Sequence, residues 1–231
     1  MSLVDVNGRA VSTENYDIKK VRQIIADPWV FLSRCVRTID QVDKVNPIKK
    51  FPEHYTYLKL YVRLWQREPL IIVPKSRRMF MSWCNIGLYL HDAMFGIGRT
   101  DVFQSKKEED SDILIERSKF ILENIPEEEL PRDLIPGWDK TYCKLKFPEL
   151  NSEILGVAQG ADQTRGLTVS GALFDEFAFW EEAEDSYSSF IPTIEGGGRC
   201  TILSSAAPGF MKKIVYDTLD EEMEHGKEEI F

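Results

Sequence analysis

Short apolar runs alternate with helical segments along the 231-residue chain, and this alternation constrains the fold more than any other feature. The predicted core strands are Leu70–Val73, Asp101–Gln104, Ser170–Phe174 and Cys200–Ser204. Strands that alternate with helices favour an α/β fold, with a mainly parallel β-sheet and helices on both faces. Ligands bind such sheets at the carboxyl ends of the strands. Functional residues are therefore expected directly after these runs.

Apolar residues at helical spacing predict the remaining elements. Asn15 or Asp17 is expected to cap a helix that continues to about Ile25. Two alternating runs, Cys143–Phe147 and Glu153–Val157, predict a β-hairpin. The other predicted helices are Trp29–Cys35, Tyr55–Trp65, Met81–Phe95, Glu108–Asn124 and Met211–His225.

A loop is predicted around Pro47 and Pro52, between the second and third helices. Aromatic residues in the third helix could stack on nucleic-acid bases, but their helical spacing predicts core positions instead. These residues are Tyr55, Tyr57, Tyr61 and Trp65.

Composition indicates a soluble, intracellular globular protein with no membrane partner. Hydrophobic residues make up 43% of the chain, enough for a sizeable core, and no apolar run is long enough to cross a bilayer. The cysteines are far apart in sequence, which favours reduced thiols over disulfides or a zinc site. They are Cys35, Cys84, Cys143 and Cys200.

Charge is unevenly distributed. Residues 1–80 hold 15 basic and 8 acidic residues, whereas residues 81–231 hold 14 and 30, for a formal net charge of -9. A basic first third on an acidic chain can carry a surface that faces phosphates. Ordinary surface charge is the simpler interpretation without further evidence.

The first candidate site is the basic loop Pro74–Phe80, which lies between a predicted strand and a helix. A phosphate-binding loop needs this context, because backbone N–H groups and the positive helix end then face the anion. Against the pattern G-x-x-x-x-G-K-[ST], only Ser82 matches, as the hydroxyl that would contact Mg²⁺. Lys75, Arg77 and Arg78 could supply the missing cation. A basic surface turn remains the alternative.

Three further motifs follow later in the chain. Asp175 and Glu176 end an apolar strand, where the aspartate can hold Mg²⁺ through water and the glutamate can activate the attacking water. Ser204 and Ser205 end another strand and could lie near a γ-phosphate. Arg165 stands on a loop beside Gly166 and could neutralise charge in a transition state. Each motif alone is weak: an acidic pair is common at a helix start, and surface arginines are frequent.

The sequence does not match the patterns of a metal-binding site or of a serine nucleophile. The histidines are scattered, and His91 is expected to be a packed or surface residue rather than a ligand. No G-x-S-x-G nucleophile elbow is present.

The ordered set of motifs resembles the N-terminal ATPase domain of viral DNA-packaging terminase large subunits, over about residues 28–215. That family has a degenerate phosphate loop of the form K-S-x-R-x-G-x-S, which fits here except at Phe80. The Arg-Gly loop, the D-E-x-A-F-W stretch and the Ser-Ser-Ala-Ala-Pro stretch match as well. The matching loop residues are Lys75, Ser76, Arg77, Arg78, Met79, Phe80, Met81 and Ser82.

The resemblance implies a P-loop ATPase core of the RecA-like (ASCE) type that uses ATP and Mg²⁺. The loop residues with Lys75 would bind phosphate, Ser82 and Asp175 would hold the metal, and Glu176 would be the general base. Arg165 would act as an arginine finger on a neighbouring subunit's nucleotide. Ser204 and Ser205 would couple hydrolysis to movement. His54 stands where the family has a glutamine that reads adenine, which leaves adenine selectivity open.

The implied function is ATP-driven translocation of double-stranded DNA into a procapsid, by a homo-oligomeric ring with portal protein and small terminase subunit as partners. The setting would be the cytoplasm of the infected host cell and, transiently, the procapsid portal. Residues 44–78 are the candidate DNA-facing segment. The alternatives are a helicase-like P-loop ATPase, or a non-catalytic nucleotide- or DNA-binding module in which Phe80 and Met81 mark a decayed loop.

Three regions are expected. Residues 1–45 form an N-terminal helical extension, residues 46–215 the ATPase core, and residues 216–231 a C-terminal helix or linker. Family members carry a second, nuclease domain, and the sequence after Pro208 is too short for one. No nuclease activity is therefore expected from this chain.

Overall fold

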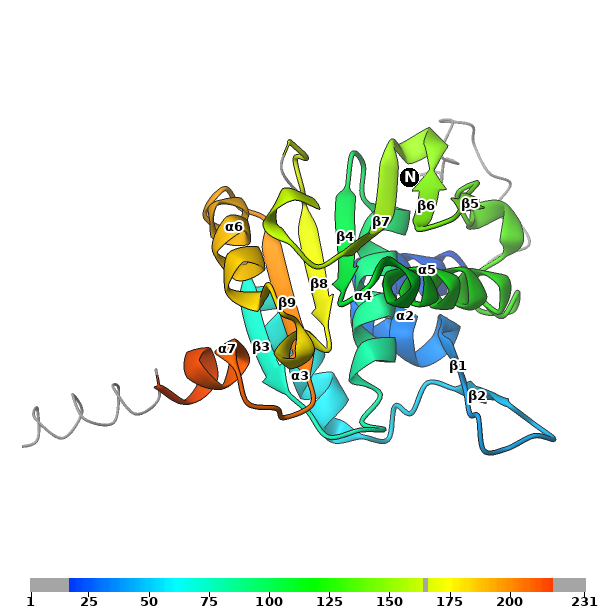
Figure 1. Cartoon of the computed structure of the whole chain (residues 1–231). Helices are drawn as coiled ribbons and strands as arrows, with labels where there is room; N and C mark the ends of the chain where they lie inside the picture. The colour runs from blue at the N-terminus through cyan, green and yellow to red at the C-terminus, as the bar shows by residue number, and fades with distance from the viewer. Residues whose placement is uncertain (1–16, 164–165, 218–231) are drawn as a thin grey trace, which may run out of the picture.

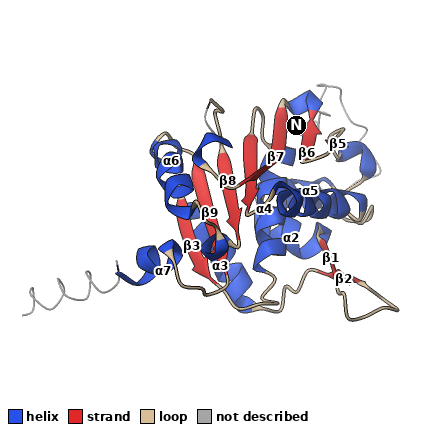
Figure 2. Ribbon diagram, viewed as in Figure 1, coloured by secondary structure: helices blue, strands red, loops and turns tan. Residues whose placement is uncertain are grey.

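A seven-stranded sheet lies between two layers of helices in the computed structural model, which describes residues 17–163 and 166–217 (Figures 1 and 2). This confirms the predicted α/β fold class. The strand order is β3-β9-β8-β4-β7-β6-β5, in which the first five strands are parallel, β6 pairs antiparallel with β7, and β5 pairs antiparallel with β6. The strands are β3 (Leu70–Pro74), β4 (Thr100–Ser105), β5 (Asp139–Thr141), β6 (Lys144–Phe147), β7 (Ser152–Ala158), β8 (Gly171–Asp175) and β9 (Arg199–Ser204).

Each face of the sheet has its own hydrophobic core, because alternate residues of a strand point to opposite faces. Leu173 and Leu203 pack with helices α1 to α5 on one face, whereas Phe174 and Ile202 pack with α6 and α7 on the other. The helices are α1 (Ile18–Ala26), α2 (Pro28–Cys35), α3 (Thr56–Arg67), α4 (Met81–Phe95), α5 (Glu108–Glu123), α6 (Ala183–Glu195) and α7 (Phe210–Lys212). None of the helices described is both long and apolar enough to cross a membrane.

Capping residues set the starts of the first two helices. The Asp17 carboxylate accepts a hydrogen bond from the Lys20 N–H at 3.1 Å, so Asp17 caps α1 as predicted. Asp27 caps α2 in the same way, and Pro28 occupies its first turn. The predicted helices that became α1 to α5 are confirmed, as is the hairpin of β6 and β7.

Short or atypical elements escaped prediction. The segment expected as a loop around Pro47 contains a two-stranded ribbon, β1 (Arg37–Ile39) and β2 (Ile48–Lys50), whose strands are too short to show a period. The expected boundary between the N-terminal extension and the core, at residues 45 and 46, falls within this ribbon. β5 is equally short. Helix α6 was missed because it contains Pro192 and several serines, which are poor helix formers.

Some burial predictions were also wrong. β3 was expected to be buried, but it is the edge strand of the sheet and is only half-buried. Tyr61 and Trp65 lie in the core as predicted, whereas Tyr55 is 38% exposed and Tyr57 half-buried. His91 is packed, with its Nε2 3.0 Å from the Ile24 carbonyl oxygen.

The cysteines and the last helix complete the description. All four cysteines are free and buried. The helix predicted over Met211–His225 begins at Phe210 as α7 and continues as a π-helix over Lys213–Asp217. Residues 218–225 lie outside the described residues.

Candidate active site

Three adjacent strands bring the predicted site residues together. β9 lies between β3 and β8, and all three strands are parallel, so their carboxyl ends meet at one edge of the sheet. The Lys75 N–H donates to the Ser204 carbonyl oxygen at 2.8 Å, which holds the start of the basic loop to β9. Segments that are 93 residues apart in the chain therefore share one site.

The Lys75 ammonium and the Glu176 carboxylate form an ion pair at the centre of the site. Lys75 Nζ lies 2.8 Å from Glu176 Oε1, and the side chains are 8% and 40% exposed, respectively. Glu176 follows the end of β8 in the left-handed backbone region, with φ of 52°. Its other carboxylate oxygen accepts from the Ser205 N–H at 3.2 Å. The carboxylate is thus fixed on both oxygens.

The Ser82 hydroxyl in the first turn of α4 donates to Asp175 Oδ1 at 3.2 Å. Asp175 is only 9% exposed. A hydroxyl and a carboxylate are oxygen ligands, and Mg²⁺ is usually bound by one or two carboxylates together with substrate phosphates and water. The donor set therefore fits Mg²⁺ held with a nucleotide. Within the described residues no group of three or more His, Cys, Asp or Glu side chains could hold a metal ion alone.

The two neighbouring carboxyls have opposite pKa shifts. Burial raises the pKa of Asp175 above its ordinary value, and the Glu176 charge adds to the rise, although Lys75 opposes both. Burial alone would also raise the pKa of Glu176. The hydrogen bond and charge of Lys75, with the Ser205 N–H, outweigh burial and hold that pKa below its usual value. Such divergence between neighbouring acids is typical of sites with distinct chemical roles.

Ser204 and Ser205 have different positions at the end of β9. Ser204 is buried, and its Oγ accepts from the Ala178 N–H at 3.0 Å and donates to the Ser205 carbonyl oxygen at 2.9 Å. Ser205 is half-buried and contacts Glu176 through its N–H. Both serines therefore lie beside the general-base candidate.

The basic loop presents some residues to solvent and others to the core. Ser76, Arg77 and Arg78 are exposed. Met79 and Phe80 are half-buried and pack against the core, and the Met81 side chain is 4% exposed. For Met79, Phe80 and Met81, the backbone rather than the side chain is the group available to a phosphate.

An aromatic group borders the loop on the side of α3. The exposed His54 ring lies 4.2 Å from the Tyr55 ring, measured between centroids, and Tyr55 lies 5.6 Å from Tyr57 and 6.1 Å from Phe80. The Tyr57 hydroxyl donates to the Met79 carbonyl oxygen at 3.0 Å. His54 thus reaches the loop through Tyr55, and Tyr55 and Tyr57, which were expected in the core, border the loop.

No motif marks Arg117, which is on α5. Its guanidinium lies 5.5 Å from the centre of the Trp83 ring, next to Ser82, and its charge interacts with that of Asp175. Helical spacing from the buried Leu114 was the only available signal that Arg117 faces inward. Arg165, the predicted arginine finger, lies outside the described residues.

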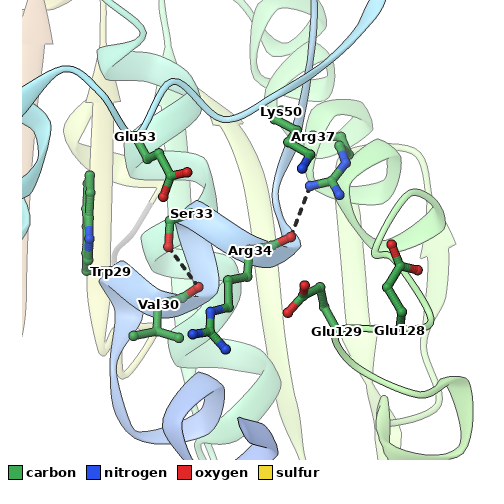
Figure 3. Close-up of a pocket in the computed structure, with 9 residues that line it drawn as sticks. All are labelled: Trp29, Val30, Ser33, Arg34, Arg37, Lys50, Glu53, Glu128 and Glu129. Atoms are coloured by element: carbon green, nitrogen blue, oxygen red, sulfur yellow. Dashed lines mark hydrogen bonds between the residues drawn. The ribbon is translucent and has the colours of Figure 1, made fainter.

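The surface of the described residues has hollows both away from this site and beside it. A cleft of about 400 Å³ opens between α2, the β1–β2 ribbon and the turn after α5 (Figure 3). Its charged lining balances three basic against three acidic side chains: Arg34, Arg37, Lys50, Glu53, Glu128 and Glu129. A more apolar pocket of about 450 Å³ adjoins the site, and its lining includes Pro74, Ala178, Ala206, Pro208, Met211 and Tyr216.

Neither family models nor curated proteins match the chain, but solved structures do. The HK97 bacteriophage large terminase aligns with a TM-score of 0.62 at 15% identity, covering 86% of this chain and 42% of that one. The large terminase from a thermophilic bacteriophage, in complex with ADP, aligns with a TM-score of 0.50 at 20% identity, covering 71% and 42%. The chain thus spans less than half of either protein. The fold is similar to that of the aligned part of these phage large terminases.

Proposed function

We propose that the chain is the ATPase motor domain of a viral DNA-packaging terminase large subunit. The observation that carries this proposal is the convergence of Lys75 and Glu176 with Ser82 and Asp175 at adjacent strand ends. The fold shared with the HK97 terminase supports it, and the ADP complex of the thermophilic phage terminase supports a nucleotide as the ligand. ATP hydrolysis would drive double-stranded DNA into a procapsid.

Positioning and charge neutralisation supply most of the catalysis in phosphoryl transfer. The basic loop binds the phosphates through its backbone N–H groups and through Lys75, Arg77 and Arg78. Ser82 and Asp175 would hold Mg²⁺, which would supply neutralisation of charge on the phosphate oxygens. His54 and the neighbouring tyrosines border the side of the loop where a base could stack.

The Lys75–Glu176 ion pair gives nucleotide binding a direct effect on the general base. While paired, Glu176 has a lowered pKa and is a weak base. A triphosphate competes for the Lys75 ammonium, and Glu176 is then free to accept a proton from the attacking water. Burial without that counter-charge raises its basicity. Glu176 would therefore be held inactive until ATP arrives.

The remaining roles concern assembly. Arg165 is proposed as the finger offered to a neighbouring subunit's nucleotide, and Ser204 and Ser205 as the residues that couple hydrolysis to movement. A homo-oligomeric ring, the portal protein and the small terminase subunit are the proposed partners. The host cytoplasm and the procapsid portal are the proposed locations.

ATPase rate against protein concentration, measured with Mg²⁺ for wild type and Glu176→Gln, tests this function. Loss of a general base is expected to lower the rate by about 10²–10⁴-fold, whereas Glu184→Gln, on the exposed start of α6, should leave it unchanged. A wild-type rate that rises more steeply than linearly with concentration supports a ring.

A Glu176→Gln variant with the wild-type rate would exclude Glu176 as the base. If the wild type neither hydrolyses nor binds ATP, the chain is a non-catalytic module. The feature that favours this second candidate is Phe80, a bulky residue at the loop position where the resembled family has glycine.

A further inference from the structure

Helix α3 carries a row of basic side chains on its outward face. Its inward face is buried through Leu58, Tyr61, Val62 and Trp65. On the outward face Lys59 and Arg63 are exposed, and the Arg67 side chain is 74% exposed. These three residues, here called the α3 basic row, are spaced four residues apart and so lie on one side of the helix.

The α3 basic row holds positive charge that little within the chain compensates. Like charges four residues apart destabilise a helix by about 0.2–0.5 kcal/mol per pair, and α3 contains no acidic residue. Lys59 contacts an aromatic ring, that of Trp29, at 5.9 Å. Arg67 pairs with the exposed Glu68 just beyond the helix. Within the described residues, neither Lys59 nor Arg63 has a carboxylate partner.

The surroundings extend this positive surface. Besides the row, residues 44–78 contain six Lys or Arg, of which Lys49 pairs with Asp43 and Lys75 with Glu176, on a chain of net charge -9. Arg77 and Arg78 are exposed on the loop that the Tyr57 hydroxyl holds to α3. A polyanion that the rest of the molecule repels can therefore approach at this surface.

We propose that the α3 basic row binds the phosphate backbone of double-stranded DNA. The three cations extend over about 12 Å at about 1.5 Å rise per residue, along which one DNA strand presents a charge about every 3.4 Å. The helix backbone that carries the row is held in place because the opposite side of α3 is packed in the core. The proposal rests on the proposed function, and it assigns the DNA contact to a surface outside the nucleotide site.

Contacts of this kind are independent of sequence. Lysine and arginine that contact phosphates position a protein on DNA without reading bases, as a translocating protein requires. Leu60 and Leu64, 60% and 38% exposed beside the row, are the feature that a second copy of this net-acidic chain would use instead. The experiment below separates these two partners.

The test compares two triple variants that lose the same charge. One is Lys59→Gln/Arg63→Gln/Arg67→Gln, and the control is Lys119→Gln/Lys144→Gln/Lys146→Gln, whose lysines already pair with glutamates. Binding to two unrelated labelled duplexes is measured by fluorescence anisotropy between about 50 and 200 mM salt. Glutamine and the replaced residues have similar helix propensities, so α3 should remain folded.

The α3 variant is expected to bind both duplexes more weakly by the same factor, and its salt slope should fall by about 1 for each cation removed. Its DNA-independent ATPase rate should equal that of the wild type, and the control should bind DNA like the wild type.

Three results would overturn the proposal: an unchanged slope, an equal loss in the control, or lost self-association with intact DNA binding. Absence of DNA binding by the wild type at the lowest salt would also overturn it. DNA binding that depends on the row in a protein without ATPase activity would reject the proposed function and leave this surface standing.

Discussion

At single residues, the basic loop adopts a glycine-type backbone without containing a glycine. Phe80 has φ of 55° and ψ of 10°, and Arg78 has φ of 64°. The left-handed region costs an L-residue roughly 1–2 kcal/mol because its Cβ approaches the following carbonyl oxygen. Such strain is found where the surrounding structure enforces it, frequently at functional sites. The loop therefore holds two residues in a backbone conformation that usually requires glycine, although it contains none.

Replacing Phe80 with glycine or alanine separates strain from packing. Both variants remove the ring that packs near Tyr55, but only glycine relieves the positive φ. We expect Phe80→Gly to be more stable than Phe80→Ala by about 1 kcal/mol, as measured by urea unfolding. Equal stabilities, or a more stable alanine variant, would show that this backbone conformation carries no strain.

At the level of elements, the pattern of hydrophobic residues predicts the helices and strands that are long and regular. The apolar period of α3 and the apolar run of β8 were sufficient to locate both elements, and Asp175 and Glu176 were found because they end a strand. The insertion of β9 between β3 and β8 has no local signature, so the ion pair between Lys75 and Glu176 could not be derived from spacing. The inward direction of Arg117 and the ribbon β1–β2 depend on tertiary packing in the same way.

Contact between α3 and the basic loop links two of these elements. The Tyr57 hydroxyl donates to the Met79 carbonyl oxygen at 3.0 Å. We expect Tyr57→Phe to lower the free energy of unfolding by about 1 kcal/mol and to weaken binding of a fluorescent ADP analogue. Tyr55→Phe is the matched control, because the Tyr55 hydroxyl has no hydrogen-bond partner in the described part of the chain. If both variants bind nucleotide like the wild type, the link is structural only.

Across the whole molecule, the sheet separates the candidate active site from a buried carboxyl, that of Asp101, at the other ends of the strands. Asp101 near the start of β4 is fully buried, and neither of its carboxylate oxygens has a hydrogen-bond partner among residues 17–163 and 166–217. Gly171 on β8 leaves room for it, since a Cβ there would lie 2.7 Å from Asp101 Oδ1. Burial raises the Asp101 pKa well above its ordinary value, with Asp92 adding to the rise, against the charges of Arg99 and Arg199.

Global stability should therefore depend on pH through Asp101. The unfolded chain releases this proton near the ordinary aspartate pKa of 3.8, whereas the folded chain keeps it to a higher pH. Because the unfolded state then binds fewer protons, this contribution to stability is fully present below pH of about 4 and falls by up to about 1.4 kcal/mol per pH unit. The loss ends at the folded-state pKa.

An asparagine side chain at position 101 cannot ionise, so the Asp101→Asn variant should not lose stability in this way as the pH rises. We expect the stability of Asp101→Asn relative to wild type to increase from mildly acidic to mildly alkaline pH, in urea unfolding measured at several pH values. Asp112→Asn is the control. It removes the same ionisable group at a site away from Asp101, where Asp112 pairs with Lys140 at 3.2 Å. Parallel stability curves for wild type and Asp101→Asn would show that Asp101 is already ionised in the folded state, with Arg99 and Arg199 compensating its burial.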